Sequence, residues 1–141
     1  DALTLISNGQ QVTADAVSTS SYDAGNVTPK RKIGAGEALG IAVAITAAGT
    51  NTGSAKLTAI NSAADTLTAP IIVGEVDLAT ADLAAGKSYF VPISPGQAPA
   101  LRYYGANYDI TGTVDFTVKA CIIPQSFFAA WETYARGFSV Q

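Results

Sequence analysis

The chain has 141 residues, of which 48% are hydrophobic and only 13% are charged, and its formal net charge is −3. This length predicts one domain, and the apolar composition excludes a disordered chain. The acidic balance, with a pI near 4.6, argues against a nucleic acid as the main partner.

Alternation of side chains with a period of two recurs along the chain and predicts short β-strands separated by turn residues. In chain order the predicted strands cover residues 3–7, 16–22, 38–46, 55–61, 71–77, 89–93, 101–110 and 113–122. Asn8-Gly9, Ala24-Gly25-Asn26 and Ala85-Gly86 are among the turns that separate them. About eight short strands at this spacing favour an all-β fold, which could be a sandwich, a jelly roll or a barrel.

Three of these strands carry more specific predictions. In 38–46, large apolar residues alternate with Gly and Ala, so we expect a central strand with something packed closely on its small-residue face. Strand 113–122 has one apolar and one polar face. It follows strand 101–110 after Thr111-Gly112, and the two are predicted to form a hairpin.

Two segments are predicted to be helical. Residues 77–85 are rich in Ala and Leu and end before Gly86, which suggests a turn or two of helix. Residues 126–136 begin at a capping serine and are predicted to be helical, within a short helical or extended aromatic tail at 126–141. This tail either folds back on the sandwich or contacts another chain, because terminal segments lie at the surface and aromatic residues are common in interfaces. The tail residues proposed as contacts are Phe127, Phe128, Trp131, Tyr134 and Phe138.

Residues that carry catalytic chemistry are scarce. The sequence has no histidine and one cysteine, Cys121, so no enzyme activity, cofactor or metal site is predicted. Cys121 is expected to be a structural thiol near a sheet edge. The acid pairs Asp77/Asp82 and Asp109/Asp115 leave a glycosidase-like mechanism as a remote possibility, although turn and capping roles explain them.

The basic residues Lys30, Arg31 and Lys32 form the chain's only basic run. A solvated loop is the simpler interpretation, and a salt-sensitive protein contact is the alternative. No membrane association is predicted, because the longest apolar-leaning run, residues 38–48, is too short to cross a bilayer.

Four stretches of sequence together suggest a known family. They are DALTLISNGQQVTADAVSTSSYD at 1–23, IGAGEALGIAVAI at 33–45, SYFVPISPG at 88–96 and LRYYGANYDITGTVDFTVKACI at 101–122. In this order and spacing they resemble the capsid cement (decoration) proteins of tailed bacteriophages, over most of the chain. The loop at 46–53 and the aromatic tail after Pro124 depart from that pattern.

The resemblance implies a jelly-roll β-sandwich at residues 1–125, followed by the tail at 126–141. It also implies a homotrimer on the outer surface of an icosahedral virion that bridges neighbouring copies of the major capsid protein, with no catalytic residues and no cofactor. On this interpretation Tyr104 and Tyr108, on the predicted hairpin, are further candidates for contacts with other subunits.

A different class of function is a lectin-like carbohydrate-binding module of a phage fibre or tail. Sugar sites stack exposed aromatic rings on the ligand and surround it with acids and amides, and Tyr104, Tyr108, Asn107 and Asp109 could supply these groups. Packing of the tyrosines across the sheet or a subunit boundary is the simpler alternative.

Overall fold

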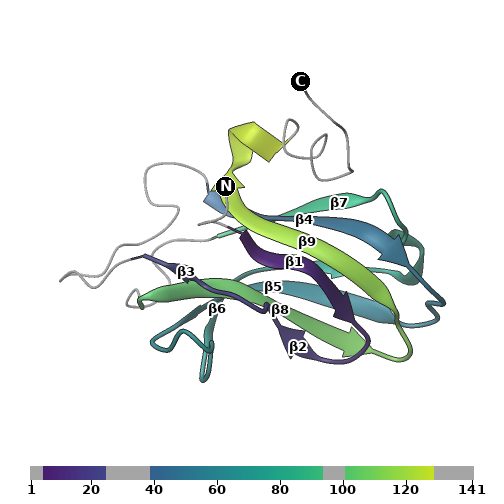
Figure 1. Cartoon of the computed structure of the whole chain (residues 1–141), viewed down its shortest axis with the longest axis horizontal. Helices are drawn as coiled ribbons and strands as arrows, with labels where there is room; N and C mark the ends of the chain where they lie inside the picture. The colour runs from purple at the N-terminus through teal and green to yellow at the C-terminus, as the bar shows by residue number, and fades with distance from the viewer. Residues whose placement is uncertain (1–4, 25–38, 94–100, 129–141) are drawn as a thin grey trace.

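The computed structural model describes residues 5–24, 39–93 and 101–128 (Figure 1). These residues form nine strands and two short 3-10 turns, η1 and η2. The elements are β1 (Leu5–Val12), β2 (Ala16–Val17), β3 (Tyr22–Asp23), β4 (Leu39–Ala48), β5 (Ser54–Ser62), β6 (Ile71–Leu78), η1 (Thr80–Asp82), β7 (Ser88–Pro92), β8 (Tyr103–Thr111), β9 (Phe116–Pro124) and η2 (Gln125–Phe127). The prediction of an all-β fold is confirmed.

The strands form two antiparallel sheets, which Figure 1 shows as two layers. Sheet A has the order β1-β9-β4-β7, and sheet B has the order β2-β8-β5-β6, with β3 also paired to β8. Five of the pairs are nested in the sequence: β5 with β6, β4 with β7, β2 and β3 each with β8, and β1 with β9. A long hairpin rolled into two sheets gives this nesting, so the sandwich is a jelly roll.

Strands β8 and β9 do not form the predicted hairpin. Strand β8 pairs with β5 in sheet B, whereas β9 pairs with β1 and β4 in sheet A. The turn at Gly112, with φ of +83°, therefore carries the chain from one sheet to the other. Each of the two strands has one apolar face, and this face packs against the opposite sheet across the core. The two apolar faces therefore do not lie on the same side of one sheet, as they would in a hairpin.

Other boundaries also differ from the predictions. Strand β1 continues through Asn8-Gly9 to Val12, because a β-bulge, with Gly9 at φ +71°, absorbs the expected turn. The strand predicted at 16–22 is broken between β2 and β3, where the Ser18 hydroxyl donates to the Ser20 carbonyl oxygen at 2.8 Å. Strand β6 extends to Leu78, so the helix predicted at 77–85 is reduced to η1.

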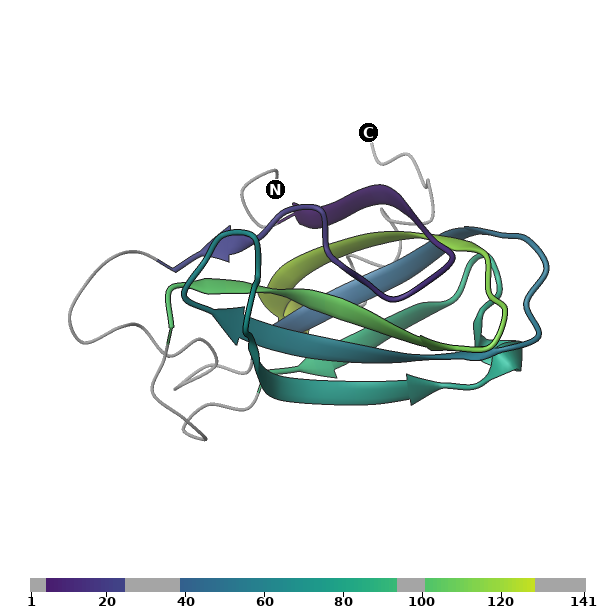
Figure 2. The ribbon, with the colours of Figure 1, turned by 90° about the horizontal axis from the view of Figure 1, so that it is seen from below.

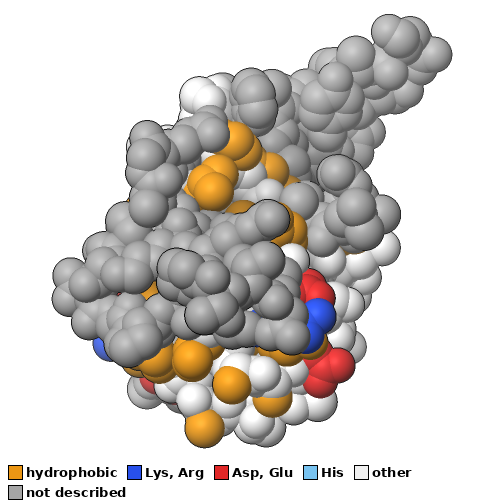
Figure 3. Space-filling view, turned by 90° about the vertical axis from the view of Figure 1, so that its left-hand side faces the viewer, with side chains coloured by type: hydrophobic (Ala, Val, Ile, Leu, Met, Phe, Trp, Pro, Cys, Tyr) orange, Lys and Arg blue, Asp and Glu red, His pale blue; other side chains and the backbone are white. Residues whose placement is uncertain are grey.

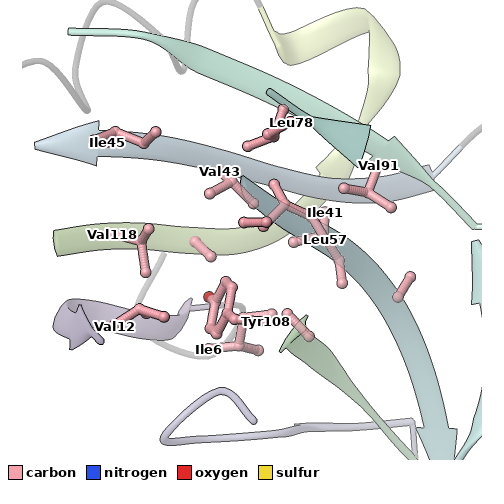
Figure 4. Packing of buried hydrophobic residues seen from close by; sticks show 14 of the residues in the cluster. Ile6, Val12, Ile41, Val43, Ile45, Leu57, Leu78, Val91, Tyr108 and Val118 are labelled. Atoms are coloured by element: carbon pink, nitrogen blue, oxygen red, sulfur yellow. The ribbon is translucent and has the colours of Figure 1, made fainter. Parts of the chain in front are cut away.

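The core lies between the sheets and is built from alternate residues of the long strands (Figure 4). Ile41, Val43 and Ile45 of β4 are each at most 1% exposed and face Leu57 of β5 and its neighbours. At roughly 1.5–3 kcal/mol for each large buried side chain, this apolar face is the main source of stability. The prediction that β4 is a central strand is confirmed.

Both long sides of the sandwich are closed. On one side the Ser20 amide donates to the carbonyl oxygen of Ile6 at 2.9 Å, which joins the β2–β3 connection to sheet A. On the other side β6 and β7 approach so closely that a Cβ on Gly74 would overlap the carbonyl oxygen of Pro92. Covered edges protect a β-protein from uncontrolled strand addition.

Candidate interaction surfaces

Of the aromatic tail residues predicted as contacts, the structure describes the side chain of Phe128 only. Its ring is 5.5 Å from that of Phe90 on β7, with an interplanar angle of 56°. The side chain of Phe127 and the residues Trp131, Tyr134 and Phe138 lie outside the described part of the chain. The structure describes only the beginning of the segment 126–136 that is predicted to be helical. Its described backbone belongs to a 3-10 turn that begins at Gln125.

The basic run at residues 30–32 also lies outside the described residues. The strand ends that flank the segments 25–38 and 94–100 are at one end of the sandwich, which we call the Leu39 end. Figure 3 looks at this end and shows hydrophobic side chains beside charged side chains of both signs.

Tyr104 and Tyr108 are not surface residues, which corrects the prediction that they contact other subunits or a sugar. They are 3% and 0% exposed, and both belong to the core between the sheets. Figure 4 shows the ring of Tyr108 among the core side chains. Burial raises the pKa of Tyr108 well above its usual value. Its hydroxyl shares a 2.8 Å hydrogen bond with Ser7 Oγ of β1, which links the two sheets through the core.

A charged pair that sequence reasoning missed joins β3 to the start of β8. Arg102 donates from Nε and Nη2 to the two carboxylate oxygens of Asp23, each at 2.8 Å. Arg102 also lies over the ring of Tyr103, 5.1 Å from its centroid. The hydrogen bonds with Asp23 are the main reason that the pKa of Arg102 is raised. The two residues are distant in sequence, so only the pairing of β3 with β8 could have indicated them.

The acids considered for catalysis lie at the opposite end of the sandwich, which we call the Gly53 end. Asp77, Asp82 and Asp109 line a depression of about 480 Å³ together with Lys56. Lys56 Nζ is 3.9 Å from Asp77 Oδ1, and Asp82 Oδ2 accepts the backbone N–H of Ala79 at 2.9 Å. These are an exposed ion pair and a turn cap, and no three acids or thiols in the described ranges are close enough to hold a metal ion.

Asp115, the fourth acid, serves a different part of the Gly53 end. Its backbone N–H donates to Asn51 Oδ1 at 2.8 Å, and its carboxylate accepts from Gln11 Nε2 at 2.9 Å. Asn51 Nδ2 is 3.3 Å from the carbonyl oxygens of Gly49, Leu83 and Asp115. One amide therefore ties three connections of the sandwich together.

The outer face of sheet B is partly covered by the connection between β5 and β6, which crosses in front of β8 in Figure 2. Leu67 of this connection is 3% exposed, and its side chain fills the space that a Cβ on Gly105 would need. Leu67 and Ala69 have φ of +60° and +47°, which is unfavourable for residues with a side chain. Ile72, where β6 begins, is 56% exposed beside this connection.

The outer face of sheet A has a floor of small side chains. Gly40, Ala42 and Ala44 of β4 point away from the core, with Phe90 on the neighbouring strand β7. Cys121 is paired with Ala42 and is 3% exposed. Since β9 lies between β1 and β4, Cys121 is at the interior of the sheet and not near an edge as predicted.

A comparison with family models matches residues 6–120 to the family Bbp16. The chain belongs to the Bbp16 family. The matched residues begin in β1 and end in β9, so the family covers the jelly roll of this Bbp16 chain and stops before its C-terminal segment.

No curated protein matches this Bbp16 chain. In the ranges that the structure describes, no helix has both the length and the apolar character needed to cross a membrane.

Proposed function

We propose that this protein is a capsid cement protein, a structural component on the outer surface of an icosahedral phage head. In this role a homotrimer binds neighbouring copies of the major capsid protein and stabilises the mature shell. The observation that carries the proposal is the nested jelly-roll pairing, because this is the fold that the resemblance to cement proteins implies.

The described side chains are consistent with a structural role. Asp82 caps a turn, Asp115 contacts Gln11, and Asp77 is paired with Lys56. Covered sheet edges give a rigid block that presents defined faces instead of pairing freely with other strands.

Trimers suit cementing because each subunit can make one weak contact with the shell. After the first contact forms, the others are effectively intramolecular, and overall avidity can exceed a single affinity by roughly 10² to 10⁴. Binding to the assembled lattice but not to free subunits stabilises the shell by about 2.7 kcal/mol per site at a free concentration of 100 times Kd.

Co-sedimentation with mature phage heads that lack a decoration protein tests this proposal. We expect saturable binding to the heads and no binding to disassembled capsid subunits or to an unrelated particle of similar size. Equal recovery with the unrelated particle, or none with the heads of its own phage, would reject the cement role.

The carbohydrate-binding alternative loses its stacking rings, because Tyr104 and Tyr108 are buried.

A further inference from the structure

The outer face of sheet A is more buried than the outside of a two-layer sandwich should be. Ala42, Ala44 and Cys121 point away from the core and are 0%, 1% and 3% exposed. Outward-facing residues of such sheets are usually polar and solvated. Here the central strand β4 offers only Gly and Ala on this face, which is suited to the close approach of larger side chains.

The chain that leaves β9 turns onto this same face. In Figure 1, η2 lies on the side of sheet A that faces away from sheet B. The ring of Phe128, the first residue after η2, is 5.5 Å from the ring of Phe90. Phe90 in turn lies over β4, because a Cβ on Gly40 would be 2.5 Å from Phe90 Cζ. Two tilted rings in contact therefore begin a layer above the small-residue floor.

Ser88 gives an independent indication that this face has a partner. It is paired with Ala44 and faces the same side, and its Oγ is fully buried with no hydrogen-bond partner among the described residues. A buried hydroxyl without a partner is unfavourable, because it has lost its hydrogen bonds to water. A group that covers the floor and reaches Ser88 would remove this cost.

The segment after Phe128 has the length and the side chains to cover the floor. Residues 129–141 span about 43 Å when extended or about 20 Å as a helix, whereas the four strands of sheet A measure about 14 Å from β1 to β7. The segment carries Trp131, Tyr134 and Phe138, whose large rings match a floor that offers little side-chain volume.

We propose that residues 129–141 dock on the outer face of sheet A of their own chain and form a third layer over Gly40, Ala42, Ala44 and Cys121. The contact between Phe128 and Phe90 favours the same chain, because it fixes the start of the segment on this face. The inference does not depend on the cement role, and the docked segment would still present its other side to a neighbouring subunit.

Cys121 is a single-site probe of this layer, because it is the only cysteine in the chain. Its rate of reaction with a maleimide would be measured in the full-length native protein and in the variant Trp131→Ala/Tyr134→Ala/Phe138→Ala. We expect the aromatic variant to react at least about tenfold faster, because opening of the layer becomes more frequent. The matched control Glu132→Ala/Thr133→Ala/Ser139→Ala, in the same segment, should react at the wild-type rate.

Two further measurements make the outcome decisive. Circular dichroism confirms that each variant is folded, and the emission of Trp131, the only tryptophan, should be blue-shifted in the native chain. An aromatic variant that reacts at the wild-type rate, or a fully water-exposed Trp131 spectrum, would overturn the proposal. A wild-type rate that rises on dilution would also overturn it, since a second copy would then supply the cover.

Discussion

Glycine 40 shows how a single residue shapes the small-residue face. A Cβ at this position would be 2.5 Å from the carbonyl oxygen of Val91 and 2.5 Å from Phe90 Cζ. The ring can move, but the carbonyl belongs to the paired strand β7 and can move only if the sheet distorts. Glycine is therefore required here for close packing and not for an unusual backbone angle.

Gly40→Ala is expected to lower the free energy of unfolding by about 1–3 kcal/mol, the usual cost of overpacking. Urea denaturation measures this change. Because the Val91 carbonyl is the fixed obstacle, adding Phe90→Ala to the variant should not remove the cost. If Gly40→Ala/Phe90→Ala were as stable as Phe90→Ala alone, the ring would be the only obstacle and this account of Gly40 would be wrong.

The buried hydroxyl of Tyr108 makes the stability of the fold depend on pH. Burial raises its pKa in the folded state above the unfolded value near 10, so the folded state holds the proton more tightly. The stability from this group is complete below pH 10 and is lost as the pH rises above it, by about 1.4 kcal/mol per pH unit. Denaturation midpoints from pH 8 to 11 should therefore fall less steeply for Tyr108→Phe than for the wild type. Parallel curves for the two proteins would contradict this expectation.

At the scale of elements, the sandwich depends on a few side chains that fix its connections. At the Gly53 end, Asn51 joins the β4–β5 connection to the residues before β9 and to Leu83 after η1. At the Leu39 end, Asn61 of β5 accepts the N–H of Leu101 at 2.8 Å and donates to the carbonyl oxygen of Tyr103 at 2.9 Å. Each asparagine side chain both accepts and donates hydrogen bonds with backbone groups of another connection.

Asn51→Ala should destabilise the fold by about 1–3 kcal/mol, because it leaves the backbone N–H of Asp115 without the acceptor that Asn51 Oδ1 provides at 2.8 Å. Thermal unfolding compared with Asn8→Ala, an exposed position on β1, measures the effect. Equal melting temperatures for the two variants would show that water replaces the Asn51 amide at no cost.

The sequence predicted most strands but not how they pair. Period-two alternation located β4, β5 and β6 to within a few residues, because their inner faces are strictly apolar. It could not show that β8 and β9 belong to different sheets, since a turn at Thr111-Gly112 suits a hairpin and a sheet crossing equally well. The burial of Tyr104 and Tyr108 depends on that pairing, so the sequence alone does not distinguish these two core residues from surface residues.

Among the candidate contacts, the sequence could indicate residue types but not their partners. The ring contact between Phe128 and Phe90 and the pairing of Arg102 with Asp23 join residues that are distant in sequence. Strand β9 ends at Pro124, and the predicted division of the chain at residue 125 and the role of the segment at 126–141 stay predictions.

At the scale of the whole molecule, the cement proposal requires several identical faces in one particle. Size-exclusion chromatography with light scattering should therefore give a mass of three times the 14.4 kDa chain. Deleting residues 126–141 should weaken trimerisation or binding to heads, because it removes the side of the docked segment that is left to face a neighbouring subunit. A monomeric wild type would count against the trimer, and unchanged sedimentation and head occupancy after the deletion would remove the tail from the contacts.

The basic run at residues 30–32 makes a separate prediction about binding. If these three cations contact the shell, occupancy should fall as salt is raised from about 50 mM to 500 mM, because screening weakens exposed charge pairs. The variant Lys30→Gln/Arg31→Gln/Lys32→Gln should bind less tightly and respond less to salt. Identical salt curves for the variant and the wild type would assign the run to solvent.

If this protein stabilises a mature head from outside, it should help the head to retain its DNA on heating. Heads that lack decoration would be incubated with or without the protein, then heated, and DNA release would be followed with an intercalating dye. We predict that decorated heads release their DNA at a higher temperature, in proportion to occupancy. Full occupancy with an unchanged release temperature, or no binding to the heads, would contradict the proposed cement role.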